Sequence, residues 1–144
     1  MELGSIYYQN GKLEDSEMQY KKALTQLDKS EDQTLTKYNL STVLYDEGKL
    51  SEAQKYAWQA YDEQDFLKND KLKVNIIYNY ALIMDRSKKL NEAKRLYGEV
   101  LSVNPNHVKA KINLSVIYMS EDNPDLDLVI EMLTQASKVE KNSF

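Results

Sequence analysis

The sequence predicts an all-α fold in which about eight antiparallel helices stack as consecutive hairpins. Residues 7–24, 44–61 and 84–101 align without a gap, and self-similarity at a period of about 20 to 50 residues is typical of stacked repeats. Each copy has two halves with apolar residues three and four positions apart, which is the pattern of two amphipathic helices around a short turn. With only four glycines and two prolines, the 144 residues contain no linker or low-complexity segment.

A leucine at the start of each second helix sets the register and recurs at intervals of 37, 40 and 36 residues, as Leu13, Leu50, Leu90 and Leu126. This register divides the chain into approximate repeats at residues 1–30, 31–67, 71–106 and 107–141. Short insertions fall near 29–33 and within 64–73, and the fourth repeat has a longer turn. We therefore treat 1–144 as a single domain and expect it to be part of a larger protein.

The turns support each hairpin in order. Gly11 and Gly48 end the first helices of repeats one and two, where glycine adopts a left-handed conformation at no steric cost. The third repeat has Lys88 at this position, so its turn is less sharply specified by the sequence. Three positions after the leucine that starts each second helix, the first three repeats have a small residue, namely Ser16, Ala53 and Ala93. A small side chain there lets the two helices of a hairpin approach closely.

These residues resemble the tetratricopeptide repeat family, whose unit of about 34 residues has the pattern W-x2-L-G-x2-Y, then G, A-x3-F-x2-A and P. The first repeat matches at Leu3, Gly4, Tyr7, Gly11, Ser16, Tyr20 and Ala23. The third repeat matches at Tyr80, Ala81, Ala93, Tyr97, Val100 and Pro105. Repeats two and four match at fewer positions, and Ala57 stands where an aromatic is usual. The resemblance covers nearly the whole chain and implies a right-handed α-α superhelix of four consecutive repeats.

Composition narrows the classes of function. The 19 basic and 23 acidic residues are mixed along the chain and give a net charge of -4, which argues against a nucleic-acid partner. The absence of cysteine excludes disulfides, thiol nucleophiles and cysteine-ligated metals. No apolar run approaches the roughly 18 to 20 residues that span a bilayer, and the first residues do not begin a secretory signal. We expect no membrane insertion and a cytoplasmic location.

No group of residues predicts catalysis. The sequence has no phosphate-binding glycine loop, no histidine pair with metal-ligand spacing and no nucleophile elbow. His107, the only histidine, is expected in a loop or at a helix start after Pro105. Carboxylates such as Glu14, Asp15 and Glu17 have the spacing of a solvated helix face. We expect no catalytic residue, no metal site, no cofactor and no enzyme activity.

Asn39, Asn79 and Asn113 occupy one equivalent position in three successive first helices. In the resembling family these helices line the concave surface, and asparagine at this point often hydrogen-bonds the backbone of an extended peptide, because an amide both donates and accepts. Helical register extends this predicted peptide-binding face to Tyr38, Asn39, Thr42, Tyr45, Asn75, Tyr78, Asn79, Leu82, Lys109, Ile112, Asn113 and Val116. The alternative is that asparagine is simply a common residue at this position of the repeat.

One subfamily binds the acidic C-terminal tails of chaperones through a two-carboxylate clamp. The residues of this chain that align with the five clamp positions are Tyr38, Thr42, Asn79, Lys109 and Asn113. Only two of the five match the residue types of the clamp. Lys109 alone is cationic, whereas the clamp works by concentrating cationic donors on carboxylates. The sequence therefore argues against a clamp.

Trp58 is the only tryptophan and allows two interpretations. Either Trp58 or Tyr56 replaces the aromatic missing at Ala57 and covers the insertion around Phe66 and Leu67, or Trp58 is an exposed anchor on the convex side.

The ends of the array also allow two interpretations, because neither has a clear polar cap and each repeat leaves a face for a neighbour. Either the terminal helices have polar outer faces, or the chain is a fragment of a longer protein or pairs through its ends with another molecule, including a second copy. Leu128 and Met132 favour this second interpretation, because they widen the apolar stripe of the last helix, which consists of Leu126, Val129, Ile130, Leu133 and Ala136.

Three functions are compatible with the sequence. The leading one is a non-catalytic scaffold that binds a protein or peptide segment on its concave face. The others are a peptide-sensing domain of a larger regulator and a non-catalytic scaffold region of a larger enzyme. Fold alone does not choose among them.

Overall fold

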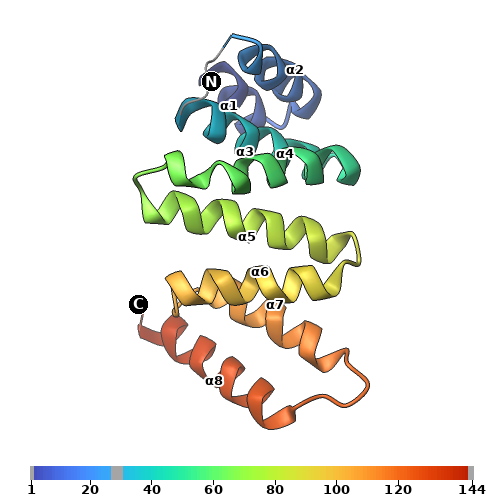
Figure 1. The fold of residues 1–144 in the computed structure, drawn as a ribbon, viewed down its shortest axis with the longest axis vertical. Helices are drawn as coiled ribbons and strands as arrows, with labels where there is room; N and C mark the ends of the chain where they lie inside the picture. The colour runs from blue at the N-terminus through green and yellow to red at the C-terminus, as the bar shows by residue number, and fades with distance from the viewer. Residues whose placement is uncertain (1, 27–30, 143–144) are drawn as a thin grey trace.

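The computed structural model describes residues 2–26 and 31–142 and shows a stack of helices along one long axis (Figure 1). The described residues form eight α-helices and one short 3-10 helix, η1 at Gln64–Phe66. The α-helices are α1 Glu2–Gln9, α2 Leu13–Leu24, α3 Glu31–Asp46, α4 Leu50–Asp62, α5 Asp70–Arg86, α6 Leu90–Val103, α7 Val108–Met119 and α8 Leu126–Asn142. The predicted all-α fold of eight helices is confirmed.

The helices pack in chain order, with α1 and α2 at one end of the stack and α7 and α8 at the other (Figure 1). The first helices α3 and α5 also contact each other directly. The predicted junction between repeats one and two, at 30/31, falls at residues 27–30, which lie outside the described residues. The exact repeat boundaries stay a prediction.

The first three hairpins have the same turn, although only two of them contain glycine. Gly11, Gly48 and Lys88 have φ values of 72°, 78° and 61°. In each turn the following N–H bonds the carbonyl five residues earlier, for example Lys89 N to Met84 O at 2.9 Å, which is the bond of a Schellman motif. The third turn is therefore as well defined as the others, because packing of α5 on α6 holds Lys88 in a conformation that its side chain disfavours.

Small residues at the centre of the hairpins let the helices approach closely. Ala53, Ala57, Ala60 and Ala93 are all buried, and they pack among large apolar side chains such as Leu40, Leu44 and Leu96. Tyr56 packs against this core at half-burial.

The insertion after α4 is held by Leu67, which is buried with Ala60 and Ile76. Trp58 takes no part in either core cluster, and half of its surface is exposed. The interpretation of Trp58 as a cover for the insertion is therefore wrong. Tyr38, Tyr61 and Leu72 pack there instead.

A nearly buried ion pair joins α3 to the end of α4. Lys37 Nζ lies 2.6 Å from Glu63 Oε1 and 2.7 Å from Oε2, and the two side chains are only 10% and 17% exposed. The two residues are 26 positions apart, so no local sequence pattern predicts the pair. The α3–α4 hairpin brings Lys37 and Glu63 together.

Spanning a membrane requires about 20 consecutive apolar residues in one helix. Within residues 2–26 and 31–142, no helix combines that length with that apolarity.

Candidate functional site

The predicted peptide-binding residues lie on α3, α5 and α7, and we call this surface the first-helix face. Its exposure increases along the array. Most residues of this face on α3 and α5 are half-buried, namely Tyr38, Asn39, Thr42, Tyr45, Asn75, Tyr78 and Leu82. On α7, Asn113 is half-buried, whereas the side chains of Lys109, Ile112 and Val116 are exposed.

The three equivalent asparagines have three different environments. Asn79 is only 7% exposed, and its Nδ2 donates to Ser41 Oγ on α3 at 2.6 Å. The Asn79 amide therefore already joins α5 to α3 through one of its N–H groups, and a peptide contact at Asn79 stays a prediction. Asn113 donates to the hydroxyls of Tyr78 and Tyr97, each at 3.2 Å. Asn39 is half-buried, and its side chain has no hydrogen-bond partner among the described residues.

The difference follows from the preceding repeat. Asn79 bonds Ser41, and the residues equivalent to Ser41 in the repeats that precede Asn39 and Asn113 are Gly4 and Ala81. Only Ser41 has a hydroxyl, so only Asn79 finds a buried acceptor there.

Tyrosine hydroxyls on and beside this face are held by neighbouring helices. Tyr97, which is fully buried on α6, donates to Asp85 Oδ2 at 3.2 Å, and its ring lies 6.0 Å from that of Tyr78. Burial raises the pKa of Tyr97 well above its usual range, and nearby Asp85 raises it further. Both tyrosines stay neutral at physiological pH, and the buried Tyr97 ring supports the half-buried ring of Tyr78.

The α1 side of the face carries a second pair of contacts. Tyr8 donates to Asp46 Oδ2 at 2.6 Å, and this hydrogen bond, together with burial, raises the pKa of Tyr8 to about 12. The guanidinium of Arg86 lies 4.9 Å from the ring centre of Tyr45, within range of a cation–π contact. These contacts fix the orientation of the tyrosines while their ring faces remain partly accessible.

A pocket of about 380 Å³ lies where the start of α5 meets the loop before α7. It is lined by Asp70, Lys71, Val74, Asn75, Val103, Asn104 and His107. His107 is the N-cap of α7, since its Nδ1 accepts from Ala110 N at 3.1 Å, and its ring centre lies 4.7 Å from that of Tyr78 with the rings tilted by 40°. Burial lowers the pKa of His107. The prediction of a helix-start role for His107 is confirmed.

An aliphatic strip continues the face on α7. Ile112, Val116 and Met119 recur every three or four residues, so they share one side of the helix, and all three are exposed. Sequence reasoning missed Met119, although its spacing from Val116 is the signal that would have found it.

Comparison with known proteins assigns the family. A family model described as tetratricopeptide repeat matches residues 1–26 and 74–107. The chain therefore contains tetratricopeptide repeats at these residues. No curated protein matches its sequence.

Solved structures agree with this tetratricopeptide assignment. MamA superposes with a TM-score of 0.83 at 18% identity, over 99% of this chain and 77% of MamA. YrrB superposes with a TM-score of 0.78 at 21% identity, over 96% of this chain and 66% of YrrB. The second tetratricopeptide domain of human RPAP3 has a TM-score of 0.67 at 24% identity, over 79% of this chain and 88% of that domain. At these identities the likeness shows the fold, the right-handed superhelix of tetratricopeptide repeats.

Asn79 and Asn39 occupy equivalent positions of two repeats, so their alanine variants form a matched pair. Asn79→Ala is expected to lower the free energy of unfolding by about 1 to 3 kcal/mol, because it leaves a buried hydroxyl without its donor. Asn39→Ala, at the equivalent position without a partner, is expected to change it by less than about 0.5 kcal/mol. Urea unfolding followed by circular dichroism measures both. Equal losses in the two variants would contradict the assignment.

Proposed function

We propose that the chain is a non-catalytic scaffold that binds an extended peptide segment on the first-helix face. The observation that carries this proposal is the exposed strip of Ile112, Val116 and Met119 beside the half-buried tyrosines of α3 and α5. An exposed apolar strip bordered by polar groups is typical of an interaction surface. The neighbouring tyrosines add contact area with few rotamers to immobilise.

Polar groups on the same face suit a peptide backbone. Asn39 and Asn75 are half-buried, and neither amide has a hydrogen-bond partner among the described residues. Each offers both a donor and an acceptor, which a main chain can use whatever its side chains are. Asn75 also borders the 380 Å³ pocket beside His107, which has room for a side chain of the peptide.

Two of the similar structures support this proposal. YrrB is described as a tetratricopeptide protein with an unusual peptide-binding site. The human RPAP3 domain was solved in complex with the HSP70 peptide SGPTIEEVD. For the present chain we infer a peptide partner but not that peptide, since Lys109 is the only cation at the matching clamp positions.

The described residues hold no group of three or more histidine, aspartate and glutamate side chains arranged to bind a metal ion. A scaffold region of a larger enzyme and a peptide-sensing domain both remain compatible with peptide binding on this face. The cytoplasmic location and the lack of a nucleic-acid partner stay predictions.

A linear peptide library displayed on phage, panned against the chain, tests the proposal. Selected peptides are expected to bind Val116→Lys at least about tenfold more weakly by calorimetry, since burial of an aliphatic side chain contributes about 1.5 to 3 kcal/mol. Met18→Lys on α2 is the control, because Met18 is similarly exposed but lies outside the face. Failure to select any peptide, or equal weakening by both variants, would refute the proposal.

Self-association through the ends of the array is a separate proposal. Leu133 on α8 is 42% exposed, whereas its register equivalent on α6, Tyr97, is fully buried under α7. Leu3 on α1 is likewise exposed, and its equivalents Leu40 and Tyr80 are buried. A second copy could cover these surfaces. Light scattering on wild type and Leu133→Glu tests this, and a wild type that is monomeric at high concentration would count against it.

A further inference from the structure

A second pocket lies away from the first-helix face, between the second helix of one repeat and the first helix of the next. It has a volume of about 520 Å³ and is lined by Ser51, Gln54, Lys55, Trp58, Gln59 and Tyr80. Five of these residues belong to α4, at positions that share one side of that helix, and Tyr80 belongs to α5. We call it the Trp58 pocket.

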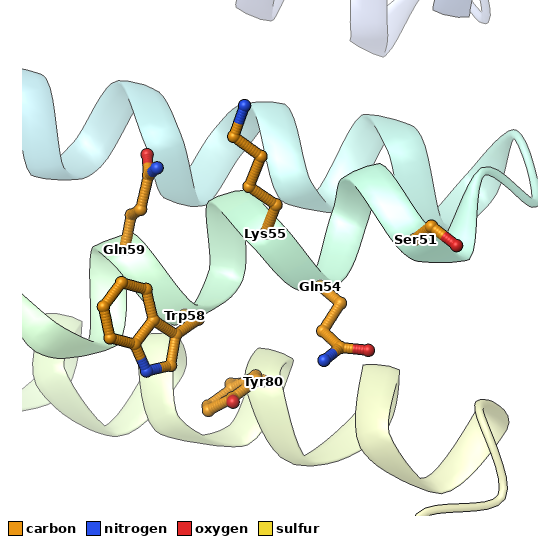
Figure 2. A pocket seen from close by; sticks show the side chains of 6 residues that line it. All are labelled: Ser51, Gln54, Lys55, Trp58, Gln59 and Tyr80. Carbon is orange, nitrogen blue, oxygen red and sulfur yellow. The ribbon is translucent and has the colours of Figure 1, made fainter.

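The aromatic residues give this pocket an apolar wall and floor. Trp58 and Gln54 project from α4 toward α5, and Tyr80 lies between them (Figure 2). Half of the Trp58 surface is exposed, and a large aromatic side chain contributes strongly to binding when a partner buries it. The Tyr80 ring packs on Tyr61 at 5.5 Å, so the floor is held rigidly by the core.

Hydrogen-bond donors dominate the polar groups of the pocket. Gln54 Oε1 accepts from Lys89 Nζ at 2.9 Å, and the Gln54 amide nitrogen lies on the Tyr80 side, where it can donate (Figure 2). The hydroxyl of Tyr80 has no hydrogen-bond partner within the part of the chain that the structure describes. Lys55 stands at the edge, 5.4 Å from the ring centre of Tyr56.

The charged groups at the pocket itself are cations. Lys55 is the only charged residue that lines it, and Lys89 borders it through Gln54. Glu92 also acts on Tyr80, but its carboxylate is paired with Arg95 at 2.7 Å. A chain with a net charge of -4 therefore presents a locally cationic, donor-rich pocket with an aromatic surface.

We infer that the Trp58 pocket is a second docking site, for an acidic peptide segment that places an apolar side chain on Trp58 and Tyr80. Its carboxylates would lie near Lys55 and Lys89, and its backbone carbonyls would accept from Gln54 and Gln59. Because none of the residues that line this pocket belongs to the first-helix face, the two sites could bind two segments at once.

Trp58 is also the reporter for the test, since it is the only tryptophan. The probes are two synthetic pentapeptides with blocked ends, glycine-leucine-glutamate-glutamate-glycine and the same peptide with lysine in place of glutamate. The acidic peptide is expected to shift the Trp58 emission to shorter wavelength in a saturable way, and the lysine peptide is not. No shift with the acidic peptide, or the same shift with both, would overturn the inference.

Charge-reversal variants locate the binding while keeping the reporter. Lys55→Glu is expected to weaken binding of the acidic peptide by about fivefold or more, because an attraction becomes a repulsion. Lys22→Glu makes the same change on an exposed part of α2 and is expected to leave the affinity unchanged. Equal affinity in all three proteins would overturn the inference. Weakening by Val116→Lys instead would assign the peptide to the first-helix face, which supports the proposed function and overturns this second site.

Discussion

Replacement of Glu63 by alanine is expected to lower the free energy of unfolding by about 3 to 5 kcal/mol. The substitution leaves the Lys37 ammonium nearly buried without its carboxylate, and an uncompensated buried charge is strongly destabilising. Both Glu63 oxygens contact Lys37 Nζ, so a single truncation removes the whole pair. Urea unfolding monitored by circular dichroism gives the loss as a fall in the transition midpoint.

The control is a double variant in which Lys37→Met and Glu63→Leu remove both charges. Replacing a buried ion pair by apolar side chains of similar size is often neutral or stabilising, so this protein is expected to be close to wild type. If the double variant were as unstable as Glu63→Ala, lost packing and not the unpaired charge would explain the effect.

Tyr97→Ala is expected to cost about 3 to 5 kcal/mol, the usual range for deleting a large aromatic side chain from a core. Tyr97 is fully buried, and its hydroxyl joins Asp85 on α5 to Asn113 on α7. The substitution therefore creates a cavity at the junction of three helices and also releases two polar groups of the first-helix face. Thermal and urea unfolding both measure the loss.

Tyr97→Phe separates packing from hydrogen bonding, because it keeps the ring and removes only the hydroxyl. We expect a loss of about 1 to 3 kcal/mol, since Asp85 and Asn113 each lose one partner. The selected peptides should also bind this variant more weakly, because Asn113 and Tyr78 are no longer fixed. Equal stability of Tyr97→Phe and wild type would mean that the hydroxyl contributes nothing.

Much of the fold could be predicted because its determinants are local. The helix periodicity and the turns at Gly11 and Gly48 depend on neighbouring residues alone. The turn at Lys88 was less certain from sequence, because only the packing of α5 on α6 holds a non-glycine residue at a φ of 61°. The first-helix face was predicted in register, but the exposure of Met119 became evident only once α7 was seen beside an open surface.

The sequence by itself determined the number of helices, their pairing into hairpins and the alignment of the three asparagines, since each follows from a repeated spacing. Only the tertiary structure decided the partner of each asparagine: Asn79 donates to Ser41, Asn113 donates to Tyr78 and Tyr97, and Asn39 has no partner among the described residues. The tertiary structure also decided that Trp58 faces a pocket, because the residues that line this pocket come from both α4 and α5. Spacing along the chain fixes a side of a helix, whereas a hydrogen bond or a pocket depends on what another helix places there.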